Sequence, residues 1–367
     1  MHIRNTLLSA ALCTLCAGPS LAAAPRYGVT LIDPLPGNAT VAALNNAGTV
    51  VGRRYDEALG GYVAYAWNAG QFTTLPGQME SPRAISNAGH IAGVSPVYEE
   101  GGYQQMMSWG MVYHQGVMHG VPDPITPDYS TGRWYTFTSP LGVNSAGTVL
   151  AMQETNAGSG IFLAHGDNAT LLPMSQGEAI NEAGQVLGNT FFDNGTSVRA
   201  VLYDNGNVVE LGSLAADGSS VASDLNDSGL AVGTSGGRTF IWRDGVMEAF
   251  GGLANETATA VNNHEGVIGT FIHGGTGLDY RHSYLYQDGV QYDLQDLLAG
   301  GGGWRITDVT DINDSGQIAG RACNGAGQCF AALLVPVPEP ATWGMLLAGL
   351  GVVAAACRRG GLRRRAA

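Results

Sequence analysis

The sequence predicts an all-β protein, a seven-bladed β-propeller, from three observations. A phrase built on Asn and Gly recurs seven times, and segments with period-two hydrophobic alternation separate its copies. Glycine is abundant (55 residues), whereas charged residues make up only 13% of the chain. Repeated units of this kind must stack on their neighbours to bury their apolar faces. Six or eight blades would follow if a degenerate copy were miscounted.

Each copy of the recurring phrase reads as a β-turn between two strands. A Gly follows the Asn by three positions, and a second Gly follows it by seven. The Asn side chain can bond to backbone amides two residues on, and the first Gly supplies a left-handed conformation. The second Gly is expected where one strand passes close to another backbone. The lead positions are Asn45, Ser86, Asn144, Asn181, Asn226, Asn262 and Asn313.

The segments between these turns predict hairpins. Alternation as in RTFIWRDGVMEAF is typical of half-buried strands, and NAG, DNG, RDG and QDG are turns in which Gly takes a positive φ. Each complete repeat therefore holds four strands, but the last ends at Val335 with three. Tyr27 to Leu35 resembles the missing fourth strand, so we expect it to complete the last blade. Closing the ring in this way removes exposed sheet edges.

The repeated units resemble the HAF-type extracellular repeats of bacterial surface proteins, which carry Ile-Asn-x-x-Gly-x-Val-x-Gly and Ala-Phe-x-Trp phrases. The resemblance covers nearly the whole body and implies a propeller-like secreted protein without catalytic residues. The chain departs from the pattern at Ser86, which replaces Asn, at Ala151, which replaces the last Gly, and at Gly266, which is displaced by one position.

The two ends of the chain differ from the repeats. Arg4, an apolar stretch and the small residues Ala22 to Ala24 predict a secretory signal peptide over residues 1–24. After it we expect a propeller over 25–335, a linker over 336–342, a membrane-inserting apolar helix over 343–357 and an Arg-rich tail over 358–367.

The C-terminal segment resembles a PEP-CTERM sorting signal. It has the triplet Pro338, Glu339 and Pro340, then the apolar run and the arginine cluster, in the order of that family. The resemblance implies export by a Gram-negative bacterium, transient insertion as an inner-membrane precursor, cleavage by an exosortase, and release to the cell surface or matrix. A permanent C-terminal anchor is the competing interpretation.

The charge balance limits the partners. All 17 basic residues are Arg, and without Arg4 and the five arginines of the tail 11 remain against 30 acids, a net charge of about −19. Nucleic-acid binding needs a basic surface and is not expected. Cations, basic surfaces and neutral polymers remain open as partners.

Two cysteines lie in the exported body, Cys323 and Cys329. In an oxidising compartment they are candidates for a disulfide across the short loop CNGAGQC, because the residues between them read as a turn. Two reduced, buried thiols are the alternative.

Two patterns resemble metal sites without completing them. The phrases that begin at Asp224 and Asp311 have oxygen-bearing residues at the first, third and fifth positions of a calcium loop, with Asn226, Ser228, Asn313 and Ser315. Position twelve is Ser235 or Ala322, so the bidentate acid is absent and turn chemistry is favoured. Of the histidines His90, His114, His119, His165, His264, His273 and His282, none has metal-pair spacing. His114 and His119 lie on the two sides of a predicted hairpin turn, where surface positions are favoured over a metal site. We expect no metal and no cofactor.

The sequence offers little support for catalysis. The sequence has no phosphate-binding Gly-Lys pair, because it contains no lysine. Acids from several blades, such as Asp217, Asp224, Asp308 and Asp311, can converge around a propeller channel in a way that spacing does not reveal. A solvated turn explains each of them equally well.

The longest departure from the period runs from Val121 to Pro140. It is rich in proline and carries Tyr129, Trp134 and Tyr135, aromatic residues of the kind that stack on sugar rings. The alternative is that they pack back on the blade as an anchored loop. A shorter excursion, from His273 to His282, reads as a flexible loop.

Two functions compete. The first is an exported, non-enzymatic binding or matrix protein that recognises exopolysaccharide or a surface protein through loops on one propeller face. The second is a secreted hydrolase or lyase that acts on a polysaccharide with acids around the channel. The export signals favour the first.

Overall fold

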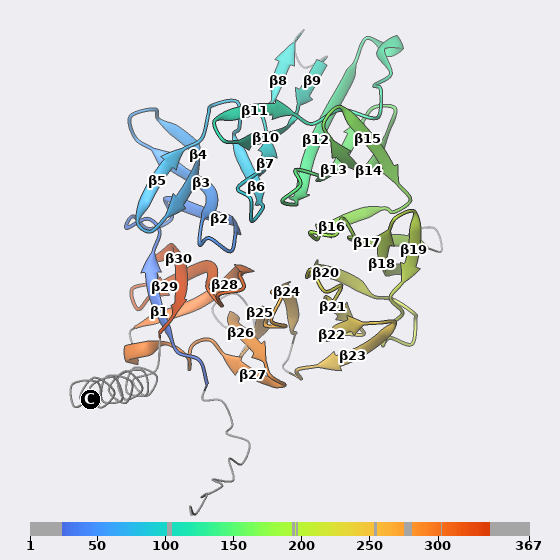
Figure 1. Cartoon of the computed structure of the whole chain (residues 1–367). Coiled ribbons are helices and arrows are strands. Elements are labelled where there is room, and N and C mark those ends of the chain that lie inside the picture. Colours follow the sequence, from blue (N-terminus) through green and yellow to red (C-terminus); the bar gives the residue numbers. More distant parts are fainter. Residues whose placement is uncertain are drawn as a thin grey trace, which may run out of the picture.

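The computed structural model describes residues 24–100, 105–192, 195, 197–252, 255–274, 281–301 and 303–337. Seven sheets stand around a common centre (Figure 1). The predicted fold class is therefore confirmed: the chain is a seven-bladed β-propeller.

The first six blades follow the chain in order, and each begins with its innermost strand. Blade 1 has β2 (Ala39–Leu44), β3 (Val50–Asp56), β4 (Gly61–Asn68) and β5 (Gln71–Thr74). Blade 2 has β6 (Ser81–Ile85), β7 (Ile91–Val94), β10 (Gly110–His114) and β11 (Val117–Gly120). Blade 3 has β12 (Trp134–Val143), β13 (Val149–Thr155), β14 (Gly158–His165) and β15 (Asn168–Leu172).

The remaining blades repeat this plan. Blade 4 has β16 (Gln176–Ile180), β17 (Val186–Phe192), β18 (Ser197–Asp204) and β19 (Asn207–Glu210). Blade 5 has β20 (Val221–Leu225), β21 (Ala231–Ser235), β22 (Arg238–Arg243) and β23 (Val246–Phe250). Blade 6 has β24 (Thr257–Val261), β25 (Val267–Ile272), β26 (Arg281–Gln287) and β27 (Val290–Asp293).

Blade 7 joins the two ends of the propeller. It contains β28 (Trp304–Ile312), β29 (Ile318–Asn324), β30 (Cys329–Pro336) and β1 (Tyr27–Leu31), and the 3₁₀ turn η4 (Ala299–Gly301) precedes it. β1 pairs antiparallel with β30, with Tyr27 opposite Pro336 and Leu31 opposite Ala332. The prediction that an N-terminal strand completes the last blade is confirmed.

Two strands were not expected. β8 (Tyr98–Glu100) and β9 (Gln105–Ser108) leave blade 2 and extend the sheet of blade 3, where β9 runs parallel to the first half of β12. The hairpin rule given above also predicts one hairpin of blade 2 over residues 107–118 (MSWGMVYHQGVM), and this prediction was wrong at its start. Only the part from Gly110 onward pairs with β7.

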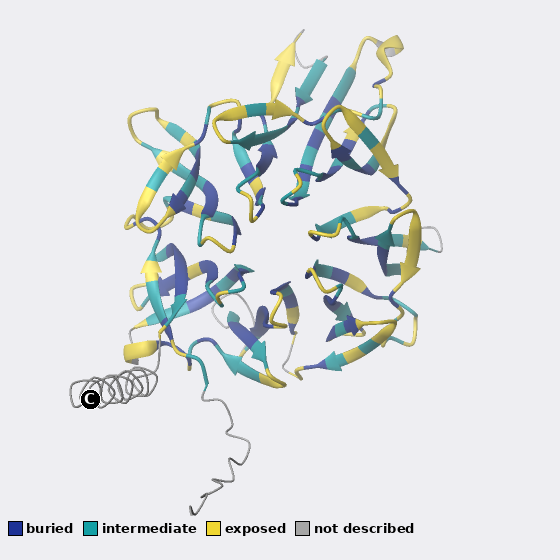
Figure 2. Ribbon diagram, in the orientation of Figure 1, coloured by how far each residue is buried: buried dark blue, intermediate teal, exposed yellow. Residues whose placement is uncertain are grey.

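The core lies between the blades. The buried apolar side chains form seven clusters, and each cluster joins two neighbouring sheets. Figure 2 shows buried residues along the strands of every blade and exposed residues at the rim. A blade thus buries its apolar faces only against its two neighbours, as the repeat argument requires.

The second Gly of the repeated phrase is needed for close approach. A Cβ atom added at Gly52 would lie 1.9 Å from the carbonyl oxygen of Thr40, and one at Gly269 would lie 2.0 Å from that of Thr257. These glycines stand opposite the bulge of the innermost strand. The predicted role of this position is confirmed.

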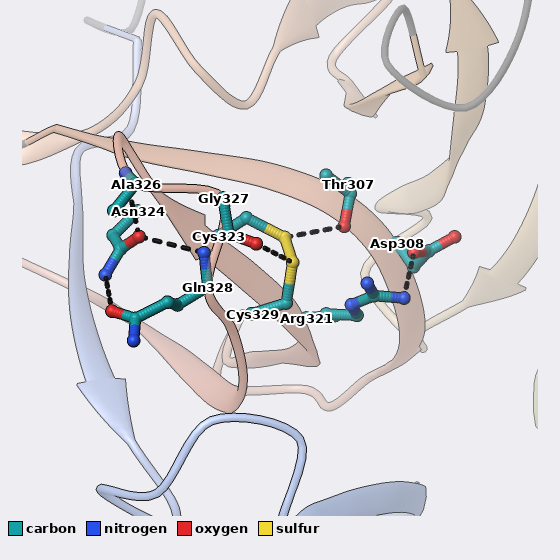
Figure 3. Close-up of a disulfide and its surroundings, with 9 residues drawn as sticks. All are labelled: Thr307, Asp308, Arg321, Cys323, Asn324, Ala326, Gly327, Gln328 and Cys329. Atoms are coloured by element: carbon teal, nitrogen blue, oxygen red, sulfur yellow. Dashed lines mark hydrogen bonds and ion pairs between the residues drawn. A yellow bond between two sulfur atoms is a disulfide. The ribbon is translucent and has the colours of Figure 1, made fainter.

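A disulfide closes the β29–β30 hairpin in blade 7 (Figure 3). The sulfur atoms of Cys323 and Cys329 are 2.04 Å apart, and the two residues are opposite each other in the strand register. Between them, Asn324 Oδ1 accepts hydrogen bonds from the backbone N–H groups of Ala326 and Gln328, each at 3.0 Å. The loop has the same Asn-led turn as the repeated phrase, but it joins β29 to β30 and so lies at the opposite end of the strands from the turn at Asn313.

The predicted signal peptide, sorting triplet, apolar helix and arginine tail lie outside the described residues. Within the described part of the chain, no helix is both long and apolar enough to cross a bilayer.

Candidate functional site

The seven Asn turns meet at one mouth of the central channel. They line a cavity of about 160 Å³. In the turn of blade 5, Asn226 Oδ1 accepts hydrogen bonds from the N–H groups of Ser228 (3.1 Å) and Leu230 (2.9 Å). The oxygen that a calcium ion would need is therefore already used by the backbone. Among the described residues no group of three or more His, Cys, Asp or Glu is placed to hold a metal ion.

The lead asparagines link each blade to the next. Asn226 Nδ2 donates to the carbonyl oxygen of Asn262 at 3.1 Å, and Asn262 Nδ2 donates to that of Asn313 at 3.0 Å. Asn313 Nδ2 closes the ring onto the carbonyl oxygen of Asn45 at 3.0 Å. Corresponding bonds leave Asn45, Asn144 and Asn181. The break falls between blades 2 and 3, where Ser86 replaces Asn and has no amide to donate.

A second ring lies beside the first. The residue after each lead position accepts a hydrogen bond from the turn of the preceding blade, as when Asp227 N–H donates to Asn263 Oδ1 at 2.8 Å. The acceptors around the ring are Asn46, Asn87, Ser145, Glu182, Asp227, Asn263 and Asp314. In both rings, these polar groups at the channel mouth form hydrogen bonds to other groups of the protein. The two rings therefore have a structural role.

Two of the four acids considered for catalysis lie away from the channel mouth. Asp217 accepts a hydrogen bond from Ser219 N–H at 2.9 Å within a turn. Asp308 lies 3.3 Å from Arg281 and 3.9 Å from Arg321 in ion pairs. Neither faces the cavity at the channel mouth.

Asp224 and Asp311 are built into the blade contacts. Asp224 Oδ2 accepts from Val261 N–H, and Asp311 Oδ2 accepts from Leu44 N–H, each at 2.8 Å and across to the next blade. Burial raises the pKa of Asp224 to about 6 and that of Asp311 to about 7, and the nearby charge of Asp224 adds to the pKa increase at Asp311. The other copies have Ala or Gly at this position.

The period breaks at a lobe on blade 3, visible at the top of Figure 1. We define the lobe as β8, β9, the segment 121–133 with the 3₁₀ turn η1 (Tyr129–Thr131), and the first half of β12. Gln153 on β13 anchors the lobe to blade 3. Its Oε1 accepts from Ile125 N–H at 2.7 Å, and its Nε2 donates to Ile125 O at 2.9 Å and Thr136 Oγ1 at 3.1 Å.

A second anchor lies at the tip of the lobe. Asn156 Oδ1 accepts from Asp128 N–H at 3.0 Å, and its Nδ2 donates to the carbonyl oxygens of Asp128 (2.7 Å) and Arg133 (3.2 Å). Asp128 in turn accepts from Ser130 N–H at the start of η1. The backbone of the excursion is therefore anchored to blade 3.

The lobe nevertheless presents aromatic side chains. Tyr129 is 57% exposed and packs edge-to-face on Trp134, with ring centroids 5.1 Å apart. Tyr98 is 46% exposed and packs on Trp109, also at 5.1 Å. Tyr135 lies on the opposite face of β12, stacked on Phe137. The structure thus brings Tyr129 and Trp134 together and separates Tyr135 from them.

The strand register places the two aromatic pairs on one face. Tyr98 is opposite Met107, which is opposite Thr136, and Trp134 is two residues from Thr136. Side chains two apart in a strand share a face, so Tyr98 and Trp134 point the same way, with Cα positions about 12 Å apart. Tyr98 and Trp109 were missed in the sequence. The alternation around the Gly pair in YEEGGYQQMMSW was the available hairpin signal.

Comparison with known proteins identifies the C-terminus and the fold. The family model for the PEP-CTERM protein-sorting motif matches residues 336–365. The chain therefore carries a signal for export and exosortase processing, through a membrane-anchored precursor sorted to the cell surface. No curated protein matches the chain.

Solved structures support the propeller. The β-propeller domain of the Trilobed protease from Pyrococcus furiosus aligns with a TM-score of 0.54 at 11% identity, over 83% of this chain and 97% of that one. That domain has an open velcro topology, whereas β1 and β30 pair here. The acylaminoacyl peptidase of Pyrococcus horikoshii aligns with a TM-score of 0.50 at 12% identity, over 82% of this chain and 52% of that one. At these identities the likeness shows the fold alone.

Proposed function

We propose that the chain is an exported surface propeller that binds a neutral exopolysaccharide through the lobe of blade 3, without catalysis. The observation that carries the proposal is the aromatic face of the lobe. Tyr129 with Trp134 and Tyr98 with Trp109 form two partly exposed pairs on one face of a sheet that the buried side-chain amide of Gln153 holds in place. Flat apolar rings with polar tips bind sugar rings by stacking.

Charge favours a neutral polymer over an acidic one. The body has a strong excess of acids, and Glu99 and Glu100 on β8 are both exposed beside the aromatic face. An acidic polysaccharide would be repelled by these carboxylates. The HAF-type resemblance, which implies a secreted surface protein, is consistent with this function and is part of the proposal.

Rigidity adds to the argument. A binding surface that is already ordered loses less conformational entropy when the ligand binds. The anchors at Gln153 and Asn156 supply this order, because both side chains use their oxygen and nitrogen atoms on lobe backbone.

A hydrolase or lyase is less well supported. Its acids were expected around the channel, but Asp224 and Asp311 bond to the backbone of the next blade and do not line the cavity at the channel mouth. The same experiment can therefore test both functions.

The test is affinity electrophoresis in gels that contain the neutral exopolysaccharide of the producing strain. We expect the wild type to be retarded and Tyr129→Ala/Trp134→Ala to lose at least tenfold in affinity, about 1.4 kcal/mol. The control is Tyr55→Ala/Tyr62→Ala, which removes another exposed edge-to-face pair (5.5 Å) on blade 1. Equal loss in both variants, or no retardation of the wild type, contradicts binding at the lobe. Release of reducing ends from the polymer contradicts the non-enzymatic assignment.

A further inference from the structure

A second candidate site lies between blades 2 and 3, on the side of the Asn turns. It is a cavity of about 590 Å³, between the β10–β11 hairpin and the turns of blade 3. Four histidines line it, His90, His114, His119 and His165. Half of the eight histidines of the chain therefore meet in one pocket.

The pocket coincides with the break in the asparagine ring. Ser86 replaces Asn here, and its hydroxyl lies 3.3 Å from His90 Nδ1. The His90 ring rests against Gly147 of blade 3, where an added Cβ atom would lie 3.3 Å from Nε2. His90 also stacks on His114, with ring centroids 3.8 Å apart and planes inclined by 15°. Imidazole rings thus line the contact between blades 2 and 3, where the hydrogen bond from an Asn side-chain amide is missing.

The walls of the pocket combine polar edges with apolar faces. Val112, Val121 and Val149 supply apolar surface, and Asp167 lies at the turn of blade 3. His114 Nδ1 is buried and has no hydrogen-bond partner among the described residues. A buried polar atom without a partner costs free energy, so this side of the pocket has unused hydrogen-bonding capacity.

We propose that this pocket binds a neutral sugar of one or two rings. Sugar hydroxyls both donate and accept hydrogen bonds, as a neutral imidazole does through its two nitrogens, and the C–H face of a sugar ring packs on apolar side chains. The volume lies within the range of about 300–1,000 Å³ for small-molecule pockets. The stacked rings of His90 and His114 do not aim their nitrogens at one point, so the same residues do not form a metal site.

The pocket lies away from the aromatic pairs of the lobe and shares with the lobe only the start of segment 121–133. β12 begins at Trp134 in the lobe and ends at Val143, opposite Val149 beside the pocket. The two sites therefore lie at opposite ends of the same strand. Sugar binding in the pocket goes beyond the proposed function, and either can fail without the other.

The ligand class predicts the direction of a pH effect. Burial and the adjacent His114 lower the pKa of His90, while Glu182 opposes them. Acid converts the imidazole of His90 to an imidazolium, which donates from both nitrogens and accepts from neither. Binding of a neutral sugar should weaken at acid pH. A carboxylate or phosphate ligand would bind more tightly instead.

The experiment is saturation-transfer NMR on the full-length chain, in mild detergent, with maltose, cellobiose, lactose, mannobiose and glucuronate. We expect a signal from at least one neutral disaccharide at pH 7.5, and at least a fivefold loss at pH 5. His114→Phe keeps a flat ring for His90 and should lose the signal at least fivefold. His119→Ala/His165→Ala tests the pocket at exposed positions if the first variant does not fold.

Two controls locate the signal. His264→Ala removes an exposed histidine from the Asn turn of blade 6 and should leave the signal unchanged, and so should Tyr129→Ala/Trp134→Ala in the lobe. The proposal is overturned if no neutral disaccharide gives a signal, if the folded pocket variants keep it, or if glucuronate alone binds and does so better at pH 5.

Discussion

Substitutions at Asn226 can separate the two roles of the lead asparagine, stabilising its own turn and bonding to the next blade. Its Oδ1 holds the turn through Ser228 and Leu230, and its Nδ2 holds the next blade through the carbonyl oxygen of Asn262. Ser86 shows what a serine does in this position: its Oγ accepts from His90 N–H at 3.1 Å, but its short side chain has no amide to donate to blade 3. Asn226→Ser should therefore keep the turn and lose the link between blades.

The magnitudes follow from burial. Asn226 is 4% exposed and Leu230 is fully buried. Loss of one hydrogen bond between blades should lower the free energy of unfolding by about 1 kcal/mol in Asn226→Ser. Asn226→Ala also leaves the N–H of Leu230 buried without an acceptor, which adds about 1–3 kcal/mol, so its total loss should be about 3 kcal/mol.

The assay is urea unfolding followed by tryptophan fluorescence, with midpoints and slopes compared among the variants. Asn207→Ser, at an exposed position of β19, is the matched control and should stay within about 0.5 kcal/mol of wild type. If Asn226→Ala and Asn226→Ser lose the same stability, or if both match the control, the division of roles between the two side-chain atoms is wrong.

Three further predictions concern stability. Burial holds the pKa of Asp311 at about 7, above its ordinary value of 3.8, so its ionisation is penalised only in the folded state; stability should fall as pH rises from about 4 to 8. Asp311→Asn keeps an acceptor for Leu44 N–H and should raise the melting temperature at pH 8 but not at pH 4. The gain in the free energy of unfolding at pH 8 should be at most about 4 kcal/mol. A pH profile parallel to that of the wild type would contradict this. Cys323→Ser/Cys329→Ser should cost about 2 kcal/mol, because the disulfide closes a short loop that Asn324 also holds, and thermal melts with and without reductant measure it; an unchanged melting temperature would speak against a stabilising bond. Deleting residues 27–31 should leave the edge of β30 open and cause aggregation on size-exclusion chromatography, and a monomeric, fully folded variant would show that β1 is dispensable.

The repeats made the fold predictable because each phrase combines several local requirements. The Gly at the third position of the turn has a positive φ in six copies, and in the sixth copy Glu265 takes that conformation with φ 63°, so the displaced Gly266 does not break the turn. Closure was predictable because the last repeat has only three strands. The N-terminal segment supplies one further strand, and together they make a complete four-stranded blade. β8 and β9 were not predictable as part of blade 3, since their partner β12 lies beyond two further strands in the sequence.

The site was less accessible from sequence than the fold. Tyr129 and Trp134 were found because they interrupt the period, but the opposite orientation of Tyr135 depends on the register of β12. The two hydrogen-bonded rings join residues 36 to 268 positions apart, and the histidine pocket brings together side chains from two blades. Such contacts depend on the ring geometry, which spacing along one chain does not specify.

Hydrogen–deuterium exchange with and without the neutral exopolysaccharide tests the central claim most directly, because it reports where the polymer binds. We predict protection in β8, β9 and residues 121–137, with little change at the Asn turns. Protection centred on the turns at the channel mouth, with none in the lobe, would contradict the account.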